Sequence, residues 1–482
     1  MKYKPKMKPR DYQNKALKKA EGKEAFGFMM AMRTGKTKVA LDEFGIGELG
    51  KEYKDQLVIA PGGVYKTWEK AINDHCSEDL LERMKVFTFR SGMGKKEQAK
   101  LAHFLQLDPS IPRTLLMNVE ALSRDGDGRK LLIHFLKQRP KVNRCVIDES
   151  TVIKNKSKRT QFINKNVPSL TRNRRILSGL PTPRSPLDYY YQFEFLDPDI
   201  LGFNNYYSFR ARVAIMKEID IGRPRPVPIV VGYREEVVEQ LKEWVEPFTF
   251  RVPFRPQIPS TFESWEVELT IEQEKAYREM EEFSTTFLEG KGHVTATVVI
   301  AQIQKLHGIL CGHVKDEDGK ERFIKEKRTD AVLDILEEYS GKAVVWCCYD
   351  ADVKKVSEAL TKEYGEGSVA RFWGGNRNTR EIEEKIYLQS PECRFMVATQ
   401  SAGGRGRTWD VADLAIYHSS LNNLEHREQS EQRTMGTDKE RRVDNIDIVA
   451  PGTVDMAILK ALRDKIDMAT IINGDNYKEW LL

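Results

Sequence analysis

The sequence predicts an α/β protein made of two lobes, each built on a parallel sheet. In the first third of the chain, short apolar or β-branched segments alternate with helical patterns, which is typical of buried parallel strands. The same alternation returns near the C-terminus, and between these regions the strand pattern fades. We therefore predict a first lobe over residues 1–204, helical insertions and a linker over 205–325, and a second lobe over 326–482.

The predicted elements follow from local hydrophobic spacing. Strands of the first lobe are expected at Phe26–Met30, Gln56–Ala60, Lys85–Phe89, Thr114–Asn118, Arg144–Asp148 and Arg174–Gly179. Those of the second are expected at Ala343–Tyr349, Val369–Gly374, Arg394–Gln400, Leu414–Ser419 and Asn445–Ala450. Helical spacing is found in Glu235–Trp244, Glu272–Phe287 and Val294–Leu310. Three prolines exclude a helix interior and predict an extended, exposed loop over Gly222–Val231.

The composition fits large globular domains. Of the 482 residues, 40% are hydrophobic and 31% are charged, which argues against wholesale disorder. No apolar stretch approaches the roughly eighteen residues of a membrane-spanning helix. The basic segment Met1–Arg10 lacks the apolar part of a signal peptide, so we expect a cytoplasmic protein with no membrane partner. The net charge of +6 permits a nucleic-acid partner without establishing one.

The cysteines give no sign of a disulfide framework or a zinc site. All six are scattered, without paired Cys-x-x-Cys spacing. Cys311 and His313 form a single pair of possible ligands, which is too few for a four-ligand site.

A phosphate-binding loop is predicted directly after the first strand. The apolar run Phe26–Ala31 is followed by Met32–Thr37 (MRTGKT) and then by a helix-compatible segment. In such a loop Gly35 lets the backbone approach a phosphate, Lys36 reaches the β and γ phosphates, and the Thr37 hydroxyl ligates Mg²⁺. The full Walker pattern has a glycine where Met30 stands, so the match is partial, and an ordinary helix start is the alternative.

A second motif ends another predicted strand. Cys145–Glu149 (CVIDE) is an apolar segment that finishes in two carboxylates. This arrangement places one acid, Asp148, on Mg²⁺ and the other, Glu149, beside an attacking water. The alternative is a solvated pair that caps the next helix. The position at the end of a core strand, about a hundred residues after the loop, favours the functional interpretation.

Several segments together resemble one family. DESTVIKNKSKRT (Asp148–Thr160) resembles the Asp-Glu box of the Swi/Snf-like ATPases of helicase superfamily two. Further segments resemble other motifs of that family in the family's order: Pro9–Gln13, Leu57–Lys70, Leu115–Asp125, Arg174–Gly202, Val397–Trp409 and Arg427–Gly436. The resemblance spans almost the whole chain. It implies two RecA-like lobes of the compact type found in bacteria and viruses.

The resemblance implies a nucleotide site with ATP and Mg²⁺ as cofactors. Its phosphate-binding residues would be Thr34, Gly35, Lys36 and Thr37, with Thr37 and Asp148 holding the Mg²⁺. Glu149 would orient the water, and the amide of Gln13 would meet the adenine edge.

The second lobe would complete this nucleotide site. Gly404 and Gly406 would let backbone N–H groups approach phosphate oxygens. Arg433 would stabilise the charge on the transferring phosphoryl group. The expected catalytic residues are therefore Lys36, Asp148, Glu149 and Arg433.

Basic residues near both motifs are expected to contact DNA phosphates. They are Lys154, Lys156, Lys158 and Arg159 in the first lobe and Arg405 and Arg407 in the second. A solvated charge run or a nuclear-localisation patch is the alternative for the first group. Because the resembling family more often tracks duplex DNA than separates strands, we expect a DNA-dependent ATP hydrolase that translocates on double-stranded or branched DNA. The resemblance to the compact type suggests that the protein acts in a bacterial or a virus-infected host cell. The sequence does not identify its protein partners.

Two departures from the family keep alternatives open. Leu180 stands where the family usually has a threonine, and Gly436 stands where a second arginine is expected. With Met30, they suggest a DNA-binding scaffold whose ATPase has decayed. An RNA-directed or branch-migrating helicase of the same superfamily is the other alternative.

Overall fold

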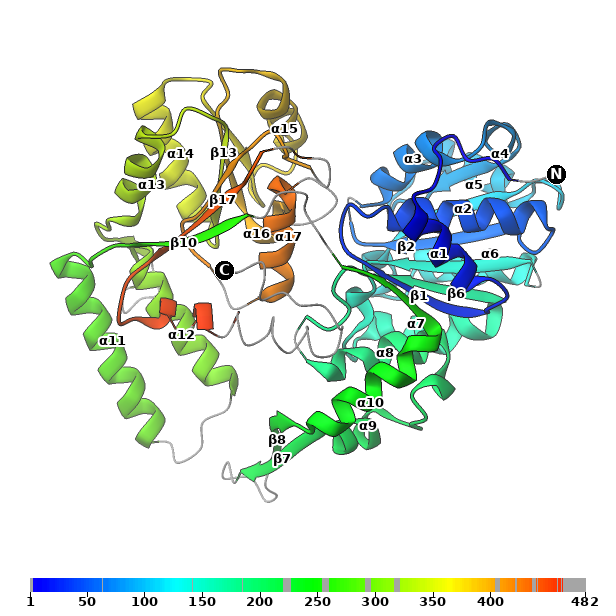
Figure 1. Ribbon diagram of the computed structural model, residues 1–482, viewed down its shortest axis with the longest axis horizontal. Coiled ribbons are helices and arrows are strands. Elements are labelled where there is room, and N and C mark those ends of the chain that lie inside the picture. Colours follow the sequence, from blue (N-terminus) through cyan, green and yellow to red (C-terminus); the bar gives the residue numbers. More distant parts are fainter. Residues whose placement is uncertain are drawn as a thin grey trace. The chain divides into compact units, whose positions relative to one another are not determined.

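The chain forms two compact units, each described by itself (Figure 1). The first comprises Met1–Ala214 and Tyr233–Arg255, and the second comprises Ile215–Gly232 and Pro256–Thr470. The computed structural model describes residues 3–62, 64–140, 142–183, 185–219, 227–253, 260–290, 296–315, 321–403, 408–420, 423–435, 439, 441–456, 458–460 and 462. The predicted linker region is thus divided between the two units.

The first unit is built on a seven-stranded sheet with the order β3-β4-β2-β5-β6-β1-β9, in which every pair is parallel. Its strands are β1 (Ala25–Met30), β2 (Asp55–Ala60), β3 (Lys85–Thr88), β4 (Arg113–Asn118), β5 (Asn143–Asp148), β6 (Asn173–Leu177) and β9 (Thr249–Val252). All six strands predicted for this lobe are confirmed. Strand β9 was not predicted, because its sequence TFRV has no apolar run and lies in the region assigned to helical insertions and a linker.

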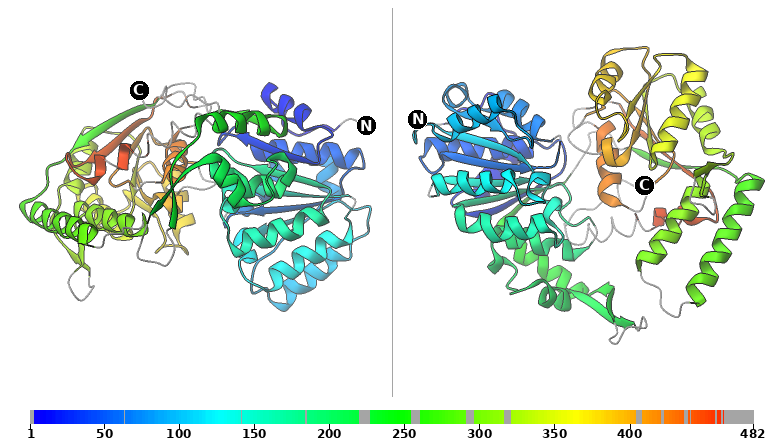
Figure 2. Two further views of the ribbon diagram at one scale, coloured as in Figure 1. Left: turned by 90° about the horizontal axis from the view of Figure 1, so that it is seen from below. Right: turned by 180° about the vertical axis from the view of Figure 1, so that it is seen from behind.

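Helices cover both faces of this sheet, and Figure 2 shows the strands between two helical layers. They are α1 (Asp11–Ala20), α2 (Lys36–Leu49), α3 (Val64–His75), α4 (Glu78–Arg83), α5 (Lys95–Leu105), α6 (Asp127–Gln138), α7 (Lys158–Leu170), α8 (Tyr189–Leu196), α9 (Tyr206–Val213) and α10 (Glu235–Val245). Strands β1, β2 and β5 are buried along their whole length, which explains why each contains an unbroken apolar run rather than an alternating pattern.

The second unit contains a six-stranded sheet with the order β10-β17-β16-β13-β15-β14. Its strands are β10 (Thr261–Glu266), β13 (Ala343–Cys347), β14 (Val369–Phe372), β15 (Phe395–Thr399), β16 (Leu414–Tyr417) and β17 (Asp444–Val449). The helices are α11 (Ile271–Gly290), α12 (Ala296–Leu310), α13 (Arg328–Glu337), α14 (Asp350–Tyr364), α15 (Arg380–Gln389), α16 (Gln400–Gly403) and α17 (Leu424–Thr434). Two parallel sheets with helical insertions confirm the predicted fold class of two RecA-like lobes.

One prediction for the middle of the chain was wrong in part. Val227–Val231 was expected in a loop, but it belongs to β8 (Val227–Tyr233), which pairs with β7 (Ala214–Ile219) in a two-stranded sheet. Pro228 fits there because a two-stranded ribbon consists of edge strands, where a missing N–H is tolerated. The rest of the predicted loop, residues 222–226, lies outside the described residues. A second small sheet pairs β11 (His313–Lys315) with β12 (Glu321–Phe323).

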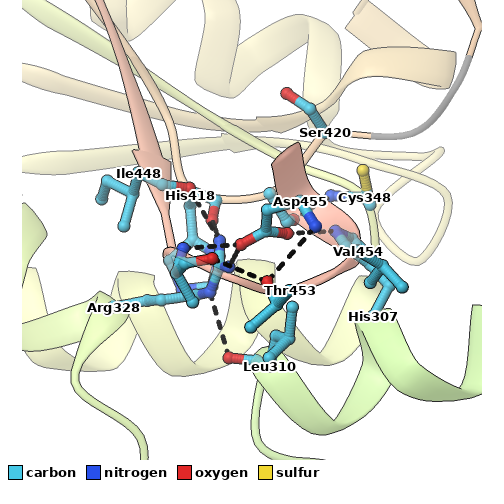
Figure 3. Close-up of polar contacts among 12 residues, drawn as sticks. His307, Leu310, Arg328, Cys348, His418, Ser420, Ile448, Thr453, Val454 and Asp455 are labelled. Atoms are coloured by element: carbon cyan, nitrogen blue, oxygen red, sulfur yellow. Dashed lines mark hydrogen bonds and ion pairs between the residues drawn. The ribbon is translucent and has the colours of Figure 1, made fainter. Parts of the chain in front are cut away.

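A buried arginine holds the strand ends of the second unit together (Figure 3). Arg328 begins α13, and its guanidinium donates to the carbonyl oxygens of Leu310, His418 and Ile448 at 3.0, 2.8 and 2.9 Å. It also forms an ion pair with Asp455. Each bond reaches a different segment, so this one side chain links α12, the ends of β16 and β17, and the segment that follows β17. Its buried charge is compensated by these partners.

Candidate functional site

The predicted phosphate loop has the expected geometry. It joins β1 to α2, and Lys36 is the first residue of the helix. Gly35 has a φ of 82°, in the left-handed region, and a Cβ at this position would lie 2.4 Å from the Gln13 Nε2 atom. The backbone conformation therefore favours glycine here, and a larger residue would also displace the Gln13 amide. Lys36 is only 8% exposed and Thr37 is half-buried in the first turn, beside the helix N-terminus that attracts anions.

The two predicted acids lie next to this loop. Asp148 ends β5, and Glu149 follows it with a φ of 48°, an uncommon conformation for a residue with a side chain. The Lys36 Nζ atom lies 3.6 Å from Glu149 Oε1. Lys36, Asp148 and Glu149 thus meet at the carboxyl end of the parallel sheet, which is where ligands bind in open α/β sheets.

Asp148 is held by a partner that the sequence did not reveal. The fully buried indole of Trp68, on α3, donates to Asp148 Oδ2 at 2.7 Å. The other oxygen accepts the Glu149 backbone N–H at 2.9 Å. Burial, together with the neighbouring Glu149 carboxylate, raises the pKa of Asp148 to about 6 against the opposing effects of Lys36 and Trp68. Trp68 lay inside a segment that resembles a family motif, but its role depends on a contact between distant segments.

Gln13 is hydrogen-bonded to the backbone of the phosphate loop. Its Nε2 donates to the Thr34 carbonyl oxygen at 2.9 Å, and its Oε1 accepts the Arg10 backbone N–H at 2.9 Å. The Tyr12 hydroxyl donates to the same Thr34 oxygen at 3.1 Å. A glutamine amide has two donors and two acceptor positions, so one of each is left for an adenine edge. The adenine contact stays a prediction.

The start of the family-like segment Arg174–Gly202 packs directly on the phosphate loop. Ser178 follows β6, and its backbone N–H donates to the Phe28 carbonyl oxygen at 3.2 Å. A Cβ on Gly179 would lie 3.4 Å from the Met32 nitrogen and 3.5 Å from the Ala31 Cα. A displacement of this segment would therefore also displace the phosphate loop. Leu180, the departure from the family, is buried.

The predicted DNA-contacting residues of the first unit differ in exposure. Lys156 and Lys158 are exposed, whereas Lys154 is 8% exposed and therefore buried. Arg159 is half-buried and donates through Nε to the Val152 carbonyl oxygen at 3.2 Å. Lys156 and Lys158 are the two members of the group that a bulky duplex reaches most easily.

The predicted residues of the second unit are described in part. Arg433 is fully buried on α17, and its carbonyl oxygen accepts the Trp409 backbone N–H at 2.9 Å. Sequence reasoning missed Arg427 on the same helix, which forms an ion pair with Asp447 and lies 3.6 Å from the centre of the Tyr417 ring. The remaining predicted residues lie outside the described part of the chain: Gly404, Arg405, Gly406, Arg407 and Gly436.

The described residues also bear on membrane and metal sites. Within the described ranges, none of the helices has the length and apolar character that crossing a membrane requires. The same residues hold no group of three or more His, Cys, Asp or Glu side chains arranged to bind a metal ion. All six cysteines are free thiols.

The chain is similar to known proteins at the level of family and solved structure. The profile of the SNF2-related domain matches residues 8–314. The Sulfolobus solfataricus SWI2/SNF2 ATPase core in complex with dsDNA aligns with a TM-score of 0.42 and 20% identity, covering 100% of this chain and 96% of that chain. The Sulfolobus solfataricus SWI2/SNF2 ATPase core domain aligns with a TM-score of 0.41 and 21% identity, covering 99% and 95%. No curated protein matches the sequence. Since the family profile matches well over half of the chain, the predicted kinship is confirmed, and this protein belongs to the SNF2-related family.

Proposed function

We propose that this protein hydrolyses ATP in a DNA-dependent manner and uses the energy to track along duplex or branched DNA. The observation that carries the proposal is the meeting of Lys36, Asp148 and Glu149 at the carboxyl end of the first sheet. Membership of the SNF2-related family supports it, because the family implies nucleotide use. The alternative of a decayed ATPase is less favoured, since these three side chains are all present in a usable arrangement.

The side chains present fit ATP and Mg²⁺. Lys36 would hold the β and γ phosphates, while Thr37 and Asp148 would hold the metal. Two adjacent carboxylates face one ammonium group, and the crowding of negative charge contributes to the raised pKa of Asp148. A divalent cation at this point would relieve that crowding. ATP supplies the phosphoryl group that is transferred, and Mg²⁺ neutralises the charge on its oxygens.

The residues of the chain would then act in sequence. Lys36, which faces Glu149 at 3.6 Å, would exchange this carboxylate for phosphate oxygens. Glu149, released from Lys36, would orient a water and accept its proton. Asp148 keeps its orientation because Trp68 and the Glu149 N–H fix both of its oxygens. Arg433 is the residue we propose for stabilising charge on the transferring phosphoryl group.

We assign DNA phosphate contacts to the basic group that follows Asp148. Lys156 and Lys158 are the exposed members, and Lys154, Arg159, Arg405 and Arg407 complete the proposed set. Cations that hold phosphates give affinity without base sequence preference, as a tracking protein requires.

A steady-state ATPase assay with duplex DNA, single strands, forked DNA and RNA tests the proposal. Duplex or forked DNA should stimulate turnover most, and Lys36→Ala should abolish the stimulated rate. Stimulation by RNA alone would favour the RNA-directed alternative. DNA binding without any turnover, in the presence of ATP and Mg²⁺, would favour the scaffold.

A further inference from the structure

An exposed aromatic ring lies between two cations on the first unit. Tyr207 is on α9 and is 60% exposed. The Arg210 guanidinium carbon lies 5.4 Å from the centre of its ring, and the Lys156 Nζ atom lies 5.9 Å from it. We refer to these three residues as the Tyr207 cluster. It joins α9 to the loop that follows the catalytic acids.

Within the described ranges, the cations of the Tyr207 cluster have no acidic partner. Among the residues that the structure describes, none forms an ion pair with Lys156 or Arg210. Arg322, by contrast, is paired with Glu272 at 2.8 Å. Two uncompensated positive charges beside an accessible ring suit a ligand that carries both negative charge and a flat aromatic surface.

The ring is presented by a well-anchored helix. Asn205 caps α9, since its Oδ1 accepts the backbone N–H groups of Tyr207 and Ser208 at 3.0 Å each. Phe209 is fully buried and packs against Tyr190 and Phe203, with ring centres 5.5 and 5.3 Å away. The helix therefore cannot turn to bury the Tyr207 ring without leaving this core. Because the helix backbone is already ordered, binding at this ring costs little backbone conformational entropy.

We propose that the Tyr207 cluster binds an unpaired nucleotide of DNA. The base stacks on Tyr207, and the neighbouring phosphates lie against Lys156 and Arg210. Bases inside a duplex have both faces covered by their neighbours, so only a base outside the stack can use such a ring. The inference rests on the proposed DNA contact of Lys156 and extends it to a class of substrate. That class is duplex DNA interrupted by unpaired bases, as in gaps and forks.

The test compares binding of two DNAs that differ only in a short gap. Fluorescence anisotropy is measured for the fully paired duplex and for the gapped duplex, with wild-type protein, Tyr207→Ala and Tyr207→Phe. Since stacking of one base gives roughly tenfold in affinity, Tyr207→Ala should weaken binding of gapped DNA by about tenfold and leave the paired duplex nearly unaffected. Tyr207→Phe keeps the ring and should behave as wild type.

A matched control and a direct readout complete the experiment. Phe323→Ala removes a ring that is 58% exposed, but its neighbour Arg322 is occupied by Glu272, so affinity for both DNAs should be unchanged. A fluorescent adenine analogue in the gap should be quenched by wild type and by Tyr207→Phe, but not by Tyr207→Ala.

Two results would overturn the inference. Tyr207→Ala could lose affinity equally for both DNAs, which would indicate a general contact with the DNA backbone. It could also bind both DNAs as tightly as the wild type does. The ATPase assay tests the proposed function separately. A wild-type protein that prefers gapped DNA through Tyr207 but never hydrolyses ATP would refute the motor and support the Tyr207 site.

Discussion

Asp148 shows how a single side chain depends on a contact that joins distant parts of the chain. Both of its oxygens accept hydrogen bonds, one from Trp68 and one from the Glu149 backbone. Partners of this kind orient a metal ligand before the metal arrives, and their loss commonly lowers metal affinity by roughly 10–100-fold. Trp68 is therefore expected to determine how well the site holds Mg²⁺.

Trp68→Phe should raise the Mg²⁺ concentration needed for half-maximal ATP binding by about tenfold. Phenylalanine preserves most of the packing but lacks the indole N–H. A Mg²⁺ titration with a fluorescent ATP analogue measures the change. Trp346→Phe is the matched control, because the Trp346 indole is equally buried but has no hydrogen-bond partner among the described residues. Equal Mg²⁺ requirements in wild type and Trp68→Phe would show that Asp148 needs no such support.

Lys36→Ala and Glu149→Gln should fail in different ways. Lys36 is the ammonium group next to the phosphate loop, so its loss should weaken ATP binding and abolish hydrolysis. Glu149→Gln keeps Asp148 for Mg²⁺ and nearly the same shape, so ATP should still bind while turnover collapses. Equilibrium binding and single-turnover hydrolysis separate the two effects. Near-normal turnover in Glu149→Gln would mean that another residue orients the attacking water.

These residues also show what the sequence could predict about the site. The proximity of Lys36 to Glu149 could be predicted, because the loop after β1 and the end of β5 lie at the same edge of a parallel sheet. The Trp68 and Gln13 contacts could not, because each depends on the side-chain conformation of a residue in another segment. The burial of Lys154 was missed for a similar reason, since a basic sequence does not say which cations face the solvent.

At the scale of elements, apolar or β-branched runs decided which strands the sequence could predict. Strands with such a run were found even where they are short, and amphipathic helices were found from their spacing. Strands β9 and β10 were missed. The former has four residues, and the latter, which begins at Thr261, is mostly exposed. Neither strand has the apolar run of a buried strand, and β10 is fixed by its pairing with β17.

The segments around Arg328 should make the second unit sensitive to acid. His307 on α12 contacts the Tyr349 hydroxyl at 2.9 Å and lies 3.8 Å from Asp455. Burial, reinforced by the Arg328 charge and opposed by Asp455, lowers the pKa of His307 to about 4, and burial likewise lowers the pKa of His418 to about 4. Both histidines are therefore neutral when folded, while the unfolded chain takes up protons below about pH 6.5.

The free energy of unfolding should consequently fall as the pH decreases from about 6.5 to about 4, by up to about 1.4 kcal/mol per pH unit for each histidine. His307→Gln removes one of these groups and should flatten the dependence by about that amount. Urea unfolding between pH 7 and pH 4.5 measures it. His103→Gln replaces an exposed histidine on α5 and serves as the control. An unchanged slope in His307→Gln would mean that this histidine is accessible to protons in the folded protein.

At the scale of the whole molecule, the division into units could be predicted only in outline. Two sheets were expected from the return of the strand pattern, and both were found. The predicted linker region is shared between the units, because α9 and α10 belong to the first and α11 and α12 to the second. Which neighbour a helix packs against depends on tertiary contacts, and hydrophobic spacing alone does not carry that information.

DNA binding by the whole molecule should depend strongly on salt, although the net charge is only +6. The binding energy is expected to come from local cations that displace counterions from phosphates, and each contact adds about one unit to the slope of log affinity against log salt. Replacing Lys156 and Lys158 together by alanine should therefore reduce this slope by up to about two, with the same loss of affinity on unrelated sequences. Lys95 and Lys96, exposed on α5, are the matched pair for a control double substitution. Anisotropy titrations over a range of salt concentrations measure the slope for each protein. A loss confined to one DNA sequence would indicate base recognition, and an unchanged slope would place the DNA on another face of the first unit.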